Sequence, residues 1–202
     1  EFRGIAIKGA TVAIEGYGNV GTFAHKFLEG AGAKIVAVSD SKGGVYLDAG
    51  LSYKELMRIK AKTGSVINFP GGKKIDGKAI FELAVDVLIP CAQPDVINKE
   101  NVDKVKAKII VEGANIPMRE EFEEALWERG VLVIPDIAAN SGGVISSYAE
   151  YKGYGKERMF KMVKEKVLNA TTLVLERSQR TKKSPRRAAL AIAAERVLKT
   201  GM

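Results

Sequence analysis

The sequence predicts an α/β fold in which a mostly parallel sheet is covered by helices on both faces. Short β-branched, apolar segments alternate with amphipathic helical segments along most of the 202 residues. A glycine pattern, G-x-G-x-x-G, stands at residues 16–21, between the first such strand and the first helix. Both observations are typical of a doubly wound, Rossmann-like sheet, in which crossover helices join parallel strands.

The glycine pattern follows a predicted buried strand at residues 11–14, which are apolar or β-branched. From Val20 to Leu28 the apolar spacing becomes helical, with one face formed by Val20, Phe23, Ala24, Phe27 and Leu28. In such a turn Gly16 permits the tight bend, Gly18 lets a pyrophosphate approach the backbone, and Gly21 lets helix and strand pack closely. The N–H groups at the start of the helix would hold the phosphates.

A second strand, residues 34–39, ends at Asp40, which lies 19 positions after Gly21. A carboxylate at this distance is placed to bind a ribose hydroxyl. The alternative is an ordinary glycine-rich turn with an aspartate that caps a helix. The combination of glycines, strand and carboxylate favours a dinucleotide site.

Composition limits the class of protein. The length suits one domain of ordinary size, and 46% hydrophobic residues suffice for a sizeable core. The apolar runs are much shorter than the ~20 residues that cross a bilayer, so no membrane partner is expected. No signal-peptide pattern is present, and the single cysteine, Cys91, suits a reducing compartment. We therefore expect a cytoplasmic protein. Because the chain does not begin with Met, we expect it to be a piece of a longer one.

The positive charge is concentrated near the C-terminus. Residues 152–202 hold 14 Lys and Arg against 4 Glu, whereas residues 1–151 carry a net charge of −2. Basic residues there alternate with core-type positions, which favours amphipathic helices with solvated faces over a nucleic-acid-binding surface. We predict a dinucleotide-binding core at residues 1–151. The helices of residues 152–202 are expected to pack on that core or on a substrate domain absent from this chain.

The remaining elements continue the alternation. Further strands are expected at residues 86–90, 109–111 and 131–134. Helices are expected at residues 52–64, opened by a capping box at Ser52, at 76–83, capped by Asp76, and at 98–105, 118–129, 140–151 and 156–177. A last helix begins after Ser184, with Pro185 in its first turn, and ends at Gly201. Loops are expected at residues 41–44 and 68–72.

Amide side chains follow several strand ends. Gln93, Asn115 and Asn140 each come after a predicted strand, where open α/β sheets bind ligands. Each alone is more often a loop or cap residue. Together with the glycine pattern they favour a nicotinamide pocket.

At this point the motifs resemble a known family. The chain resembles the C-terminal nucleotide-binding domain of the glutamate/leucine/phenylalanine/valine dehydrogenases, and within them the archaeal and bacterial hexameric glutamate dehydrogenases. The resemblance is carried by VAIEGYGNVG at residues 12–21, VSDSKGG at 38–44, PCAQ at 90–93, VEGAN at 111–115 and IPDIAANSGGV at 134–144.

The resemblance implies roles for individual residues. The cofactor-binding set comprises Gly16, Tyr17, Gly18, Asn19, Val20, Gly21, Asp40, Ser41, Lys42, Ala92, Gln93, Asn115 and Asn140. In this set the glycine turn lies against the pyrophosphate, Asp40 binds the adenosine ribose, and the two asparagines hold the nicotinamide side. Val144 lines the substrate pocket, and Ser147 stands where glutamate-specific members bind the side-chain carboxylate.

The implied reaction is the NAD(P)-dependent oxidative deamination of L-glutamate to 2-oxoglutarate and ammonia. The family's catalytic lysine and aspartate belong to a substrate domain N-terminal to this one, so we expect no catalytic residue in this chain and no activity of the chain alone. His25 is expected to be at the surface or half-buried, Cys91 to be pocket wall, and no metal site is indicated. The full-length protein is expected to be a homo-hexamer.

Alternatives remain open. Ser141 replaces the usual alanine, and the segment after Tyr151 is shorter than in many glutamate dehydrogenases, as in leucine- or valine-type enzymes. A non-catalytic dinucleotide-binding module is a third possibility. Asp40 favours NAD, whereas Ser41 and Lys42 suit the 2′-phosphate of NADP. Both cofactors are therefore expected to bind.

Overall fold

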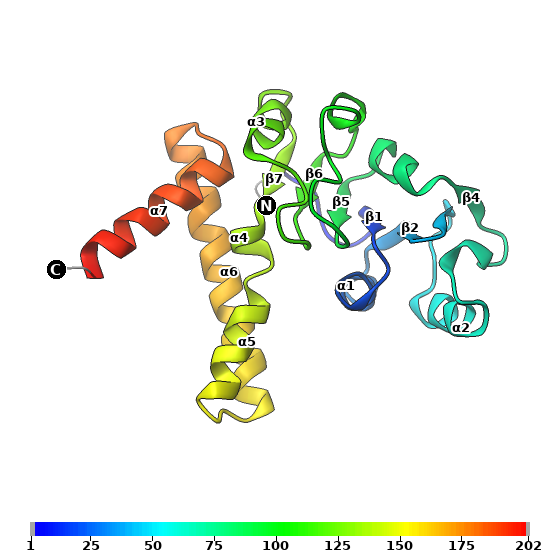
Figure 1. Cartoon of the computed structure of the whole chain (residues 1–202), viewed down its shortest axis with the longest axis horizontal. Helices are drawn as coiled ribbons and strands as arrows, with labels where there is room; N and C mark the ends of the chain where they lie inside the picture. The colour runs from blue at the N-terminus through cyan, green and yellow to red at the C-terminus, as the bar shows by residue number, and fades with distance from the viewer. Residues whose placement is uncertain (1–2, 201–202) are drawn as a thin grey trace. The chain divides into compact units, whose positions relative to one another are not determined.

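The computed structural model describes residues 3–200 (Figure 1). The chain divides into two compact units, Glu1–Leu132 and Val133–Met202, and each is described by itself. The proposed functional division at residue 151 stays a prediction. Within residues 3–200 no helix combines the length and apolarity needed to cross a membrane.

The structure has a seven-stranded sheet in the order β4-β3-β2-β1-β5-β6-β7; strands β1 to β6 lie in the first unit, and β7 begins at the last residue of that unit. The strands are β1 Thr11–Glu15, β2 Lys34–Asp40, β3 Gly43–Tyr46, β4 Lys73–Ile75, β5 Val87–Pro90, β6 Ile109–Val111 and β7 Leu132–Ile134. β1 pairs in parallel with β2 and β5, and β5 pairs in parallel with β6. β3 is antiparallel to both β2 and β4. The predicted α/β class with a mostly parallel sheet is confirmed.

The core lies around the central strand. Val12, Ala13 and Ile14 of β1 are at most 1% exposed, because neighbouring strands flank β1 and the sheet is covered on both faces. The helices are α1 Asn19–Gly30, α2 Tyr53–Thr63 and α3 Glu120–Glu128, and the 3₁₀ turns are η1 Val66–Asn68, η2 Gly77–Glu82 and η3 Val102–Lys104. Figure 1 shows α1 and α2 on one side of the sheet and α3 on the other. This arrangement brings the start of α1 to the end of β1.

The antiparallel pair of β3 and β4 was not predicted: β3 begins inside the loop expected at residues 41–44, whereas β4 begins directly after residues 68–72, where the expected loop is confirmed. Glycine and lysine have low strand propensity, so the local signal is weak. Tertiary contact forms the strands instead: a Cβ on Gly44 would lie 2.8 Å from Ile75 Cγ1, so only glycine permits this approach.

Of two predicted helix caps, one is confirmed and the other is wrong. The Asp76 carboxylate accepts a hydrogen bond from the Lys78 N–H at 2.7 Å and caps η2, as predicted. Ser52 stands at the N-cap of α2, but its side chain makes no capping hydrogen bond, so the expected capping box is wrong. The helix expected at residues 98–105 is also wrong, because only η3 forms there. The Asn101 carboxamide accepts from the Asn98 N–H at 2.9 Å and stabilises a turn instead.

Helix α1 forms as predicted, but its buried face differs from the apolar stripe. Val20, Phe23 and Phe27 are 50%, 57% and 66% exposed, while Ala24 and Leu28 pack against the core. His25, expected at the surface or half-buried, is fully buried. The physical reason is that both of its ring nitrogens find hydrogen-bond partners inside the unit.

The second unit is helical. Its helices are α4 Asp136–Ala139, α5 Gly142–Tyr151, α6 Lys156–Thr181 and α7 Pro185–Thr200. Helix α6 packs against the other three helices, and α5 runs alongside it (Figure 1). The Ser184 hydroxyl accepts from the Arg187 N–H at 3.4 Å, which agrees with the predicted cap of α7. The predicted end at Gly201 lies outside the described residues.

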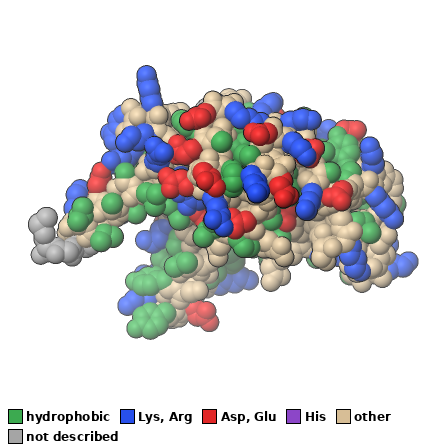
Figure 2. Space-filling view, turned by 45° about the horizontal axis from the view of Figure 1, so that its top comes forward, with side chains coloured by type: hydrophobic (Ala, Val, Ile, Leu, Met, Phe, Trp, Pro, Cys, Tyr) green, Lys and Arg blue, Asp and Glu red, His purple; other side chains and the backbone are tan. Residues whose placement is uncertain are grey.

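Apolar side chains are exposed where α5 and α6 meet. Tyr151 is 82% exposed, Phe160 54% and Tyr148 49%. Figure 2 shows hydrophobic side chains gathered at this end of the unit, whereas acidic and basic side chains are interspersed over the visible face of the first unit. The visible face of the first unit therefore carries no field of a single charge sign.

Candidate functional site

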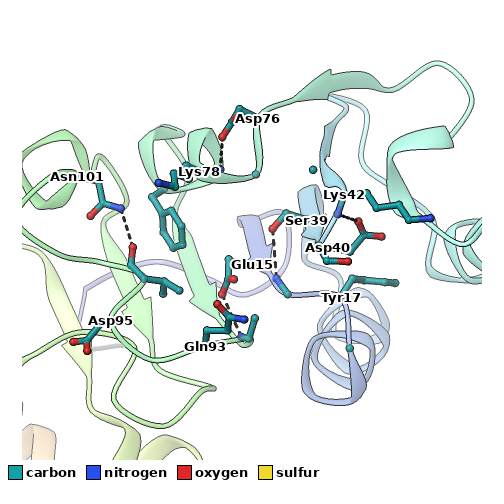
Figure 3. A pocket seen from close by; sticks show the side chains of 18 of the residues that line it. Glu15, Tyr17, Ser39, Asp40, Lys42, Asp76, Lys78, Gln93, Asp95 and Asn101 are labelled. Atoms are coloured by element: carbon teal, nitrogen blue, oxygen red, sulfur yellow. Dashed lines mark hydrogen bonds between the residues drawn. The ribbon is translucent and has the colours of Figure 1, made fainter.

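A cavity of about 940 Å³ opens at the carboxyl ends of β1, β2 and β5 (Figure 3). Its walls include Glu15 at the end of β1, Asp40 at the end of β2, and Ala92 and Gln93 directly after β5. In the strand order, the chain leaves β1 for β2 on one side and later returns to β5 on the other. This is the switch point at which open α/β sheets bind ligands.

Eight of the predicted cofactor-binding residues line this one cavity: Gly16, Tyr17, Gly18, Asp40, Ser41, Lys42, Ala92 and Gln93. Three more, Asn19, Val20 and Gly21, open α1 directly beside them but do not line the cavity. Asn115 follows β6 and is outside the lining. Asn140, Val144 and Ser147 lie in the second unit, which is described separately.

The three glycines of the pattern meet three different physical demands. Gly16 has φ of +85°, and a Cβ there would lie 2.5 Å from Ala92 Cβ. A Cβ on Gly21 would lie 2.1 Å from the carbonyl oxygen of Gly16. Gly18 has ordinary extended backbone with φ of −93°, and nothing lies within 4 Å of the position of its Cβ. Only Gly18 therefore faces open space, where a ligand can approach the backbone.

The backbone of the glycine turn leaves donors available. The N–H groups of Gly16 and Tyr17 donate to the Ser39 carbonyl at 3.1 and 2.7 Å. The N–H groups of Gly18, Asn19 and Val20 have no acceptor among residues 3–200. They stand at the N-terminus of the 12-residue helix α1, where the helix dipole is positive. This arrangement suits an anion such as a pyrophosphate.

Asp40 is held by three hydrogen bonds. Its Oδ1 accepts from the Lys42 N–H at 2.9 Å and the Ser65 hydroxyl at 3.0 Å, and its Oδ2 accepts from the Val66 N–H at 2.9 Å. Ser65 and Val66 come from the turn after α2, some 25 residues along the chain. These two donors could not be predicted, because no local sequence pattern links them to Asp40.

Glu15 is a site residue that sequence reasoning missed. Its Oε2 accepts from the N–H groups of Cys91 and Ala92, both at 3.2 Å, and so joins the end of β1 to the segment after β5 (Figure 3). Burial raises the pKa of Glu15, and the hydrogen bonds from Ala92 and Cys91 oppose this rise. An acidic residue directly before the glycine turn was the available signal.

Lysines also enter the cavity. Lys60 of α2 donates from its ammonium to the Tyr17 carbonyl, and the same nitrogen lies 5.5 Å from the centre of the Tyr17 ring. Lys78 and Lys104 line the cavity as well. The helical spacing of α2 did not distinguish Lys60 from its solvated neighbours, so this residue was missed too.

Cys91 does not form the pocket wall that we expected. It is half-buried and packs against the core of the first unit, outside the cavity lining. Burial, with a smaller contribution from Glu15, raises the pKa of the thiol to about 12. Across residues 3–200 no group of three or more His, Cys, Asp or Glu side chains could hold a metal ion.

In the second unit, a buried ion pair holds the segment that carries Asn140. Arg186 of α7 donates to the Asp136 carboxylate at 2.8 Å, and the two side chains are 12% and 8% exposed. Downstream on α5, Val144 is 77% exposed, and the exposed Ser147 hydroxyl donates to the Gly143 carbonyl at 3.2 Å. Both proposed substrate-pocket side chains therefore face outward within this unit.

Comparison with known proteins places these features in context. A profile described as Glutamate/Leucine/Phenylalanine/Valine dehydrogenase matches residues 1–201. A glutamate dehydrogenase of Aeropyrum pernix is 46% identical, with 96% of this chain and 49% of the relative covered. An NADP-specific glutamate dehydrogenase of Saccharolobus shibatae is 42% identical, with 96% and 48% covered. The chain thus spans about half the length of these relatives.

Solved structures agree with the fold. The hetero-hexameric glutamate dehydrogenase of Thermus thermophilus, in a leucine-bound form, superposes with a TM-score of 0.85 at 30% identity, covering 96% of this chain and 47% of that one. L-Tryptophan dehydrogenase of Nostoc punctiforme superposes with a TM-score of 0.75 at 26% identity, covering 97% and 53%. The two proteins differ in the amino acid that their names give, so the fold alone does not define a substrate.

Proposed function

The chain belongs to the glutamate/leucine/phenylalanine/valine dehydrogenase family, and from this premise we propose that it is the nucleotide-binding part of an NAD(P)-dependent glutamate dehydrogenase. The observation that carries the proposal is the cavity at the switch point, where the open face of Gly18 and the oriented carboxylate of Asp40 line the same space. The whole enzyme would oxidise L-glutamate to 2-oxoglutarate and ammonia.

We propose that the free N–H groups at the start of α1 hold the pyrophosphate. Asp40 then accepts a hydrogen bond from a ribose hydroxyl, and the segment of Ala92 and Gln93 lies against the dinucleotide from the β5 side. The fit is supported by donors that lack other acceptors and by a cavity large enough for part of a dinucleotide. When bound, the nicotinamide supplies the hydride acceptor, which no side chain can replace. Asn115 and Asn140 are proposed to hold the nicotinamide side, and Ser147 the glutamate carboxylate.

The proton-transfer groups are proposed to come from a substrate domain outside this chain. The two carboxylates at the strand ends are held by other groups: Glu15 accepts from two backbone donors and Asp40 from three donors, so neither is arranged as a proton shuttle. The chain spans about half the length of its relatives, so the other half of such a protein is where we propose that these groups lie. A hexamer remains a proposal for the full-length protein.

The choice between NAD and NADP depends on the loop after β2. Asp40 repels a 2′-phosphate, whereas Lys42, which follows two residues later, brings a compensating charge. We propose that both cofactors bind. Lys42→Ala should weaken NADP binding by up to about fivefold and leave NAD binding unchanged. The effect is small because Lys42 is exposed, and water screens its charge. Equal effects on both cofactors would show that Lys42 is no phosphate ligand.

A direct test is fluorescence titration of the 202-residue chain with NADH and NADPH, together with a turnover assay. We expect binding of both and no oxidation of glutamate. Absence of binding at millimolar cofactor would refute the proposal, and turnover by the chain alone would refute the division of labour. Substrate profiling of the full-length protein, with leucine and valine beside glutamate, separates this function from a branched-chain enzyme.

A further inference from the structure

Tyr17 stands between two glycines of the turn, yet it is only 1% exposed and each of its polar groups has a partner. Its N–H donates to the Ser39 carbonyl at 2.7 Å, and its carbonyl accepts from the Lys60 ammonium. Its hydroxyl lies 2.7 Å from Nδ1 of His25. The residue is thus held at three points that come from β2, α2 and α1.

The geometry fixes the direction of the hydrogen bonds. Nε2 of His25 lies 3.0 Å from the Leu51 carbonyl, which can only accept, so Nε2 carries the hydrogen. Nδ1 of the neutral ring is then the acceptor, and the Tyr17 hydroxyl donates to it. Burial lowers the pKa of His25, which keeps the ring neutral. His25 also contacts the rings of Tyr17 and Tyr53 edge-on, at centroid distances of 5.7 and 5.6 Å.

We propose that His25 and Lys60 are positioning residues that act through Tyr17 to hold the glycine turn in its anion-binding shape. The proposal rests on the proposed dinucleotide site and deepens it. Gly16 and Gly18 give this turn more conformational freedom than any other residue would. Ordering the turn before the ligand arrives removes that cost from binding. The available N–H groups of Gly18, Asn19 and Val20 are then fixed where a pyrophosphate is held.

A role in packing alone would not require this chemistry. The space around His25 lies within the first unit's core, where an apolar side chain fills volume without a desolvation cost. Instead, the His25 ring accepts a hydrogen bond from the Tyr17 hydroxyl through Nδ1 and donates one to the Leu51 carbonyl through Nε2. The ring thereby links the residue between the glycines to the segment before α2. A buried network in which each hydrogen bond is made gives rigidity and one conformation rather than added burial.

The test compares ADP-ribose, which carries the pyrophosphate and a second ribose, with adenosine, which carries neither. Wild type, Tyr17→Phe and His25→Leu are titrated with ADP-ribose and with adenosine, and chemical shifts are followed by NMR. We expect both variants to bind ADP-ribose about fivefold more weakly, the effect of one hydrogen bond, and to bind adenosine unchanged. His25→Gln, which retains one acceptor and one donor, should recover most of the affinity.

Tyr46→Phe is the matched control, since it removes a tyrosine hydroxyl that is bonded to Asp48, outside the cavity lining. Lys60→Met provides a second route if a core variant does not fold, because it removes the donor to the Tyr17 carbonyl; Lys60→Gln, which removes the same positive charge from the cavity but keeps a donor, is its control. Equal weakening of both ligands, or unchanged binding of ADP-ribose, overturns the positioning role. If the wild type itself binds neither NADH nor ADP-ribose, the proposed function fails, and this inference fails with it.

Discussion

Two glycines of the same motif are expected to respond to alanine in opposite ways. Gly18→Ala adds a methyl group where no atom lies within 4 Å, on ordinary extended backbone. Gly21→Ala adds the same group 2.1 Å from the carbonyl oxygen of Gly16 and 3.1 Å from Ile14 Cγ2. The first substitution intrudes on the proposed ligand, and the second intrudes on the protein itself.

The magnitudes follow from these distances. At position 18, alanine is a poorer N-cap than glycine by about 0.5–1 kcal/mol, and the lower entropy of the unfolded chain offsets this by about 0.4–1 kcal/mol, so the free energy of unfolding should change by less than about 0.5 kcal/mol. At position 21, ordinary contact requires α1 to move away from the Gly16 carbonyl by more than 1 Å, since ordinary contacts begin at 3.4 Å. Overpacking of this kind costs about 3 kcal/mol, and the better helix propensity of alanine recovers only about 1 kcal/mol.

Urea unfolding and NADH titration of both variants give the comparison. Gly18→Ala should unfold like the wild type but bind NADH at least about tenfold more weakly, because the methyl group occupies the approach to the free N–H groups. Gly21→Ala should lose about 2 kcal/mol of stability. A stable Gly21→Ala would refute the packing role of Gly21, and a Gly18→Ala that binds NADH normally would refute the assignment of the open side of Gly18 to the ligand.

Other predictions concern groups outside the turn. The Lys108 ammonium, 2.8 Å from Asp86, and the Thr11 donors lower the pKa of Asp86 to about 2. The contribution of ionised Asp86 to the free energy of unfolding is therefore complete above pH about 4 and is lost as the pH falls through about 2. Asp86→Asn should lower the free energy of unfolding in urea by about 1–2 kcal/mol at pH 7 and remove this loss of stability at acid pH. Arg186→Met should cost about 3 kcal/mol, because it removes a buried guanidinium that donates to the buried Asp136 carboxylate; the double variant with Asp136→Asn should recover part of this in thermal unfolding. Cys91, whose pKa of about 12 keeps it protonated at pH 8, should react with iodoacetamide at least about a hundredfold more slowly than free cysteine; a rate near that of free cysteine would contradict its burial.

The parts of the fold that could be predicted are those whose cause is local. A β-branched run followed by spaced glycines and a helical pattern defines β1, the turn and α1 within 20 residues. The pairing of β4 with β3 could not be predicted, because Lys73–Ile75 becomes a strand only by pairing with Gly43–Tyr46, about 30 residues earlier in the chain. Sequence periodicity measures the first kind of cause and not the second.

The same division explains the error at His25. Helical spacing placed Phe23 and Phe27 with the apolar face, and they are stacked on each other but exposed. A polar ring is buried on that helix because the Leu51 carbonyl and the Tyr17 hydroxyl supply its partners, and neither is visible from the pattern of α1. The same holds for the candidate site: the glycines of the turn could be predicted from the sequence, whereas the buried His25 that we propose to position the turn could not.

Asp40 illustrates why a motif residue and a working site are different things. A carboxylate offers about four acceptor positions, and here Lys42, Ser65 and Val66 occupy three of them. The remaining one defines a single direction from which a hydroxyl can donate, so the proposed ribose contact is set before a ligand arrives. The sequence supplies the carboxylate at the right distance from the glycines, but the turn after α2 aims it. Because that turn is anchored to Asp40, a change in Ser65 acts on the proposed cofactor site even though Ser65 is 1% exposed and does not line the cavity.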